Sequence, residues 1–169
     1  MSQGPRRVTP GSSHPAGEQY RIAIVGSGTL KGKELAEVLP ESVLAASELK
    51  LMDDDESLGQ LEAVGEEMTF VQSVSRDNFD NVDFAFFASR PEFTRKNWTL
   101  ARAAGASIVD LSYTLEKEPS ATVRAPWIER EVGQVMAPEL EPGPVVAAHP
   151  AAVVLGLLLV RAPRLAPIR

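Results

Sequence analysis

A glycine-rich stretch with the spacing GxGxxxG carries the first candidate chemistry of this 169-residue chain. The stretch consists of Gly26, Ser27, Gly28, Thr29, Leu30, Lys31 and Gly32. Glycines let backbone N–H groups approach the oxygens of a diphosphate, and a helix that begins at such a turn adds the positive end of its dipole. The pattern predicts a phosphate-binding turn, to which Lys31 and Lys33 would add positive charge. An ordinary tight turn between a strand and a helix is the alternative.

Asp53 follows Gly32 by 21 residues and ends a short apolar run. An acidic residue about 20 residues beyond a glycine-rich turn accepts the ribose hydroxyls of NAD in dinucleotide-binding folds. A 2′-phosphate beside it would meet a repulsion of about 4 kcal/mol at about 4 Å, for an effective dielectric constant of about 20. Asp53 therefore favours NAD over NADP as the cofactor. Because three more acidic residues follow, a solvated acidic loop is the alternative.

Strands and helices that alternate along the chain must position these residues. Short apolar runs predict strands at 21–25, 48–52, 68–72, 83–88, 106–112 and 144–149, and helical spacing predicts helices at 33–39 and 91–105. This alternation is typical of parallel βαβ units. We expect one α/β domain with a doubly wound, Rossmann-type, mostly parallel sheet. The stretch 114–143 contains four prolines and is expected to be irregular apart from short pieces.

The expected domain boundaries follow from the composition of the two ends. Residues 1–19 are rich in Gly, Pro and Ser and predict a flexible tail, residues 20–160 the dinucleotide-binding domain, and residues 161–169 a C-terminal tail whose prolines end any helix. The most apolar segment, 145–160, is too short for a membrane helix and is interrupted by His149 and Pro150. We expect it to form a buried strand and a buried helix start, in a cytoplasmic protein.

The composition excludes several classes of chemistry. The chain has no cysteine, which rules out disulfides, thiolate metal sites and a cysteine nucleophile within these residues. It has two histidines, so a site of several histidines is not expected, and no metal site is predicted. The net charge of −6 argues against binding to nucleic acid, which requires a basic surface.

From Arg21 to Leu159 the sequence resembles the N-terminal half of the aspartate-semialdehyde dehydrogenase family. The segment 21–39 is similar to the opening strand, the GxxGxxG turn and the first helix of the family, with Thr29 at the middle glycine. The segment 48–59 is similar to the second strand and its loop, where members that use NADP carry Arg and Ser. The resemblance implies a cofactor site that includes Ser89 and Arg90, near the nicotinamide.

The last similar block, 144–159, covers a strand and the catalytic turn of the family. In the family this turn has the sequence Asn-Pro-Asn-Cys. Here that turn reads His149-Pro150-Ala151-Ala152, with Ala152 at the position of the nucleophilic cysteine. The family's second domain, with its general-base His, its substrate-binding Arg and most of its dimer interface, has no counterpart in these 169 residues. The resemblance thus implies no catalytic residue and a catalytically silent NAD-binding module.

Two other readings stay open at this point. One is a semialdehyde dehydrogenase subunit that another chain completes, and the other is a scaffold that binds no cofactor. Without the second domain, the apolar segment 145–160 is expected to be exposed to a partner. We therefore expect a homo-oligomer or a protein partner at this segment.

Overall fold

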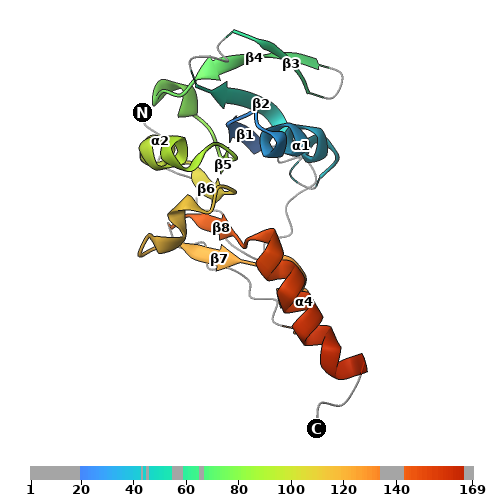
Figure 1. Ribbon diagram of the computed structural model, residues 1–169. Helices are drawn as coiled ribbons and strands as arrows, with labels where there is room; N and C mark the ends of the chain where they lie inside the picture. The colour runs from blue at the N-terminus through green and yellow to red at the C-terminus, as the bar shows by residue number, and fades with distance from the viewer. Residues whose placement is uncertain are drawn as a thin grey trace.

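The computed structural model describes residues 20–42, 44, 46–54, 59–64, 67–133 and 143–165 and contains one sheet of eight strands (Figure 1). The strands are β1 (Tyr20–Val25), β2 (Ala46–Asp53), β3 (Leu61–Val64), β4 (Glu67–Ser73), β5 (Phe84–Phe87), β6 (Ser107–Asp110), β7 (Thr122–Arg124) and β8 (Val145–Ala147). The helices are α1 (Leu30–Val38), α2 (Pro91–Ala103), α3 (Pro126–Glu131) and α4 (Pro150–Leu165), with 3₁₀ turns η1 (Leu39–Glu41), η2 (Asp77–Phe79) and η3 (Thr114–Lys117).

The order of the strands, β3-β4-β2-β1-β5-β6-β8-β7, shows a doubly wound topology. The chain adds β2 and β4 on one side of β1 and then crosses to add β5 and β6 on the other side. Every neighbouring pair is parallel except β3 with β4. The predicted mostly parallel α/β sheet is therefore confirmed. In such sheets, ligands bind where the direction of winding reverses, beyond the carboxyl ends of the strands.

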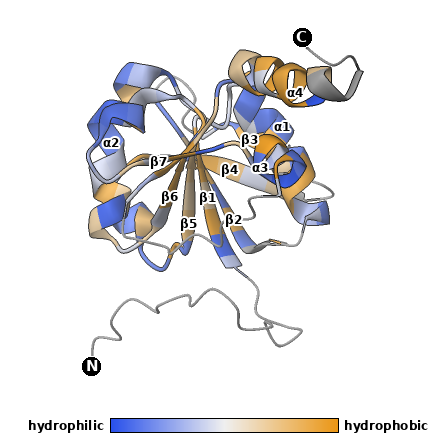
Figure 2. Cartoon of the chain, turned by 90° about the horizontal axis from the view of Figure 1, so that it is seen from below, coloured by the Kyte–Doolittle hydropathy of each residue, from blue (hydrophilic) through white to orange (hydrophobic). Residues whose placement is uncertain are grey.

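The alternating side chains of β1 fill two apolar cores, one on each face of the sheet. Ile24 packs in the cluster that includes Ala36 of α1, and Val25 packs in the cluster that includes Trp98 of α2. Within β1, the side chains of Ile22, Ile24 and Val25 are fully buried. Figure 2 shows α2 on one side of the sheet and α1 and α3 on the other. This burial fixes the carboxyl ends of β1 and β5, from which the candidate site is built.

The start of the first helix and one additional strand differ from the sequence prediction. The helix predicted to begin at Lys33 begins at Leu30, because the side chain of Thr29 accepts a hydrogen bond from the Gly32 backbone N–H and caps the helix earlier. The strand β3 was not predicted; it pairs in antiparallel fashion with β4, with Leu61 opposite Phe70. The short pieces expected within 114–143 are η3, β7 and α3.

The last helix corrects two predictions. The buried helix start expected from composition is wrong, because Leu155 and Leu158 are 58% and 62% exposed, which agrees with the other expectation that segment 145–160 is exposed. The helix was also expected to end at Val160, but it continues to Leu165. The helix projects from the β7–β8 side of the sheet (Figure 1), and its neighbour in the described residues is the short α3. Apolar composition predicted burial, whereas the fold offers too little surface to cover this helix.

Candidate functional site

The glycine-rich turn closes tightly between the ends of β1, β2 and β5. The N–H of Gly26 donates to the carbonyl oxygen of Met52 at 2.7 Å, and its φ is +88°. A Cβ added at Gly26 would lie 2.5 Å from the Cα of Ser89. A Cβ at Gly32 would overlap the carbonyl oxygen of Gly26. These two glycines are therefore needed for the close approach of the turn to its neighbours.

Thr29 holds the turn together and starts α1. Its Oγ1 lies 2.9 Å from the carbonyl oxygen of Gly26 and 3.1 Å from that of Ala88, and it accepts the N–H of Gly32 at 3.1 Å. One hydroxyl thus joins the turn, the helix and the residue after β5. The N-terminus of α1, where the helix dipole is positive, is held at the carboxyl edge of the sheet.

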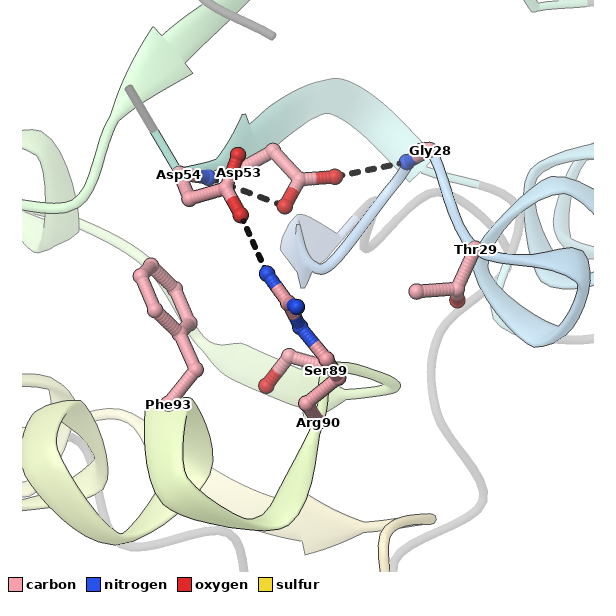
Figure 3. A pocket seen from close by; sticks show the side chains of 7 residues that line it. All are labelled: Gly28, Thr29, Asp53, Asp54, Ser89, Arg90 and Phe93. Carbon is pink, nitrogen blue, oxygen red and sulfur yellow. Dashed lines mark hydrogen bonds and ion pairs between the residues drawn. The ribbon is translucent and has the colours of Figure 1, made fainter. Parts of the chain in front are cut away.

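Asp53 is the last residue of β2, and backbone amides fix its carboxylate. Oδ2 accepts the N–H of Gly28 at 2.8 Å, and Oδ1 accepts the N–H of Asp54 at 2.9 Å. The carboxylate therefore lies directly beside the glycine-rich turn, as the spacing of the sequence predicts (Figure 3). Each oxygen has a second lone pair with which it can accept a hydroxyl group.

A cleft of about 220 Å³ lies between this turn and the start of α2. Its lining consists of Gly28, Thr29, Asp53, Asp54, Ser89, Arg90 and Phe93 (Figure 3). The structure thus brings together five of the predicted site residues from three separate strand ends. Asp54 and Phe93 were not predicted. Asp54 belongs to the acidic run after β2, but nothing in the sequence marks Phe93.

Ser89 and Arg90 make different contacts in this cleft. The Oγ of Ser89 lies 2.8 Å from the Oγ1 of Thr94 within the first turn of α2. Arg90 Nη2 donates to Asp54 Oδ2 at 2.9 Å, so its guanidinium lies at the Asp53 end of the cleft. The nicotinamide contact that the resemblance implies for Arg90 stays a prediction, and the ion pair holds the guanidinium near the end of β2.

Ser27 is the buried member of the turn. Its side chain is 1% exposed, and among the described residues its Oγ is the one buried side-chain oxygen or nitrogen without a hydrogen-bond partner. A buried hydroxyl normally has a partner. Ser27 is not among the residues that line the cleft, so its hydroxyl lies beneath the surface of the turn. Leu30, also predicted for the site, has a side chain that is 74% exposed.

A family model described as the semialdehyde dehydrogenase, NAD binding domain, matches residues 21–153. The chain belongs to this family. A USG-1 protein homolog from Pseudomonas aeruginosa is 33% identical over 142 residues, which are 84% of this chain and 42% of that protein. An aspartate-semialdehyde dehydrogenase from Prochlorococcus marinus is 30% identical over 63% of this chain and 31% of that protein. The chain thus spans less than half the length of these relatives.

Solved structures related to this semialdehyde dehydrogenase domain agree with the fold. A probable aspartate-semialdehyde dehydrogenase from Pseudomonas aeruginosa superposes with a TM-score of 0.70 at 28% identity, over 87% of this chain and 43% of that one. Aspartate semialdehyde dehydrogenase II from Vibrio cholerae gives 0.73 at 20% identity, over 87% and 47%. A Candida albicans enzyme solved with NADP gives 0.65 at 16% identity, over 87% and 47%. The similarities to the Vibrio cholerae and Candida albicans structures show the fold alone.

The position that the family resemblance assigns to the catalytic cysteine lies in the first turn of α4. Ala152 is exposed there, and its N–H donates to the carbonyl oxygen of His149 at 2.9 Å. The neighbouring N–H of Ala151 donates to His149 Nδ1 at 3.2 Å. A methyl group has no lone pair and cannot attack a carbonyl carbon.

Lys31 of the semialdehyde dehydrogenase domain extends toward Leu111 and Tyr113, which follow β6. Its Nζ donates to the carbonyl oxygen of Leu111 at 2.7 Å and lies 4.3 Å from the ring centroid of Tyr113. The Tyr113 ring is 5.0 Å from the His149 ring. The ammonium group is therefore held by a carbonyl and an aromatic face, away from the residues that line the cleft.

Within the ranges that the structure describes, no three acidic or histidine side chains lie together in a way that could hold a metal ion. In the same ranges, no helix has both the length and the apolar character needed to cross a membrane.

Proposed function

We propose that residues 20–160 bind a dinucleotide in the cleft beside the glycine-rich turn, with NAD preferred over NADP. The anchored carboxylate of Asp53 carries this proposal. It stands at the end of β2, fixed by the N–H groups of Gly28 and Asp54, with lone pairs left for two ribose hydroxyls. The membership of the semialdehyde dehydrogenase NAD-binding family supports a site of this class.

The residues of the turn fit the other parts of such a cofactor. Gly26 and Gly32 have no side chains, so the turn can close tightly. A diphosphate would lie against the backbone of this turn, at the positive end of α1. A 2′-phosphate would instead stand beside the carboxylates of Asp53 and Asp54, which disfavours NADP.

We also infer that the 169 residues do not oxidise a semialdehyde through a covalent intermediate. The bound dinucleotide would supply a hydride acceptor, but the covalent route also needs a thiolate. Ala152 stands at the expected position of that thiol, and the 169 residues contain no cysteine. A functional subunit completed by another chain is the enzyme alternative. A scaffold with no cofactor is the third reading, against which the geometry of Asp53 argues.

The deciding experiment is a calorimetric titration of the protein with NAD and, separately, with NADP. We expect NAD to bind more tightly than NADP, and the Asp53→Asn variant to lose roughly 10-fold in affinity for NAD, the scale of a hydrogen bond to a charged group. Asp77→Asn, which removes a carboxylate from η2 at a different part of the sequence, controls for net charge.

Three results would contradict these proposals. Binding of neither dinucleotide at millimolar concentration would favour the scaffold. Tighter binding of NADP would reverse the cofactor preference. A turnover rate above background with aspartate semialdehyde, phosphate and NAD would contradict catalytic silence, because the proposal predicts a blank assay.

A second proposal concerns the exposed face of α4. Val154, Leu155, Leu158 and Leu159 are each 58–64% exposed. Monomeric proteins seldom leave such a set of neighbouring large apolar side chains in water. We propose that this face contacts protein, either a second copy of the chain or another polypeptide. The cytoplasmic location stays a prediction.

A further inference from the structure

An ion pair crosses the cleft next to Asp53. Arg90 precedes α2 and Asp54 follows β2, so the two side chains approach from opposite walls (Figure 3). The distance from Arg90 Nη2 to Asp54 Oδ2 is 2.9 Å. The side chain of Arg90 is 75% exposed, whereas that of Asp54 is 28% exposed. The guanidinium is therefore accessible to a ligand, but it is held on one side by a carboxylate.

The two neighbouring carboxylates are held in different ways. Asp53 has one backbone N–H on each oxygen, from Gly28 and from Asp54, so its position does not depend on Arg90. Asp54 holds Arg90 through its side chain. Among the described residues, this end of the cleft has two carboxylates, of Asp53 and Asp54, and one guanidinium, of Arg90. Removing the carboxylate of Asp54 would leave one of each and release the guanidinium.

A guanidinium group suits phosphate because its parallel N–H groups match two phosphate oxygens. In dinucleotide-binding folds, an arginine near the ribose accommodates the 2′-phosphate of NADP. We propose that the Arg90–Asp54 ion pair sets the choice between the two dinucleotides. Asp54 keeps Arg90 from binding a 2′-phosphate, and loss of this ion pair allows the site to accept NADP. This inference rests on the proposed function, that the cleft binds a dinucleotide.

The test measures the dissociation constants of NAD and NADP by calorimetry for the protein and for four variants. In Asp54→Asn, the ratio of the NADP constant to the NAD constant should fall at least roughly 10-fold, the scale of one charge-assisted hydrogen bond. Asp54→Ala should give the same result and guards against an Asn side chain that still holds Arg90. The double variant Asp54→Asn/Arg90→Gln should lose most of the gain, because the gain requires the guanidinium.

Glu131→Gln is the matched control. Like Asp54→Asn, this substitution removes one negative charge. Like Asp54, Glu131 pairs with an arginine, since its Oε1 is 2.6 Å from Arg161 Nη2. This pair joins α3 to α4, and neither residue lines the cleft. The ratio should not change in this variant.

The outcomes separate the two proposals. If the unmodified protein binds NAD but Asp54→Asn leaves the ratio unchanged, the role of the ion pair is wrong and the proposed function stands. If the double variant keeps the whole gain, repulsion from Asp54 and not release of Arg90 sets the preference, and this inference is also wrong. If the unmodified protein binds neither dinucleotide, both proposals are wrong.

Discussion

The hydroxyl of Thr29 makes three contacts that can be tested by removing it. Thr29→Ala takes away the cap of α1 and the links to the carbonyl oxygens of Gly26 and Ala88. Loss of an N-cap costs about 1 kcal/mol, which for a domain of this size lowers Tm by roughly 2–4 °C. We also expect weaker binding of NAD, because the turn is no longer tied to β5.

Thr29→Ser is the control for this prediction, since it keeps the hydroxyl and removes only a methyl group. Its urea midpoint should stay near that of the unmodified protein. If Thr29→Ala and Thr29→Ser unfold at the same midpoint, the hydroxyl does not stabilise the turn in the way described.

The sequence predicted single residues well where local spacing decided their place. Asp53 lies against the glycine-rich turn because a parallel sheet brings the ends of β1 and β2 to one edge, which the pattern of strands already implies. The partner of Arg90 was not predictable in this way. Asp54 precedes it by 36 residues, and the same run contains three other acidic residues, Asp53, Asp55 and Glu56. Which carboxylate reaches the guanidinium depends on the path of the backbone after β2.

An ion pair fixes the start of the short helix α3. Arg124, the last residue of β7, donates from Nε and Nη2 to the two carboxylate oxygens of Glu129 at 2.9 and 2.6 Å. The N–H of Ala125 donates to Oε1 of Glu129 at 2.9 Å. The hydrogen bonds from Arg124 lower the pKa of Glu129 from its ordinary value of 4.5. The lowered pKa means that folding stabilises the charged form of this carboxyl group.

Glu129→Gln should therefore destabilise the protein in a pH-dependent manner. At neutral pH we expect a loss of about 1 kcal/mol, as for a well-oriented pair near the surface. The stabilisation is fully present above the unfolded-state pKa and disappears as the pH falls below 4.5 through the lowered pKa of Glu129. Urea unfolding of both proteins at several pH values measures this difference. A difference that stays constant down to pH 3, or a similar loss in Glu116→Gln, would contradict it.

The strand that the sequence did not predict and the burial that it predicted wrongly have different physical causes. The strands β3 and β4 are separated in the sequence by Gly65 and Glu66, a two-residue connection typical of a hairpin, but the run 61–64 is too short to stand out by periodicity. In α4 the residues 150–160 carry no charge, so nothing in the pattern distinguishes a buried face from an exposed one. Exposure of that helix depends on what the rest of the fold offers to cover it.

Within the ranges that the structure describes, α4 is covered on one side. The short α3 packs against it, and a Cβ at Gly156 would overlap the side chain of Ile128, so the two helices lie very close there. The opposite side presents the four exposed apolar side chains of the α4 face, in one turn after another. A surface of this kind is self-complementary when two copies meet about a two-fold axis.

Leu158→Glu tests this surface by sedimentation velocity over a range of concentrations. The unmodified protein should sediment above its monomer mass of 18.2 kDa, and the variant should sediment as the monomer. Burial of one leucine contributes about 1.5–3 kcal/mol, and it counts twice at a two-fold interface, so the dissociation constant should rise by at least roughly 100-fold. Met68→Glu, which alters a side chain of β4 that is 60% exposed, should leave association unchanged. Because Leu158 is 62% exposed, Tm measured below the association concentration should not fall. An unmodified protein that stays monomeric and carries no bound polypeptide would show that water alone covers this helix.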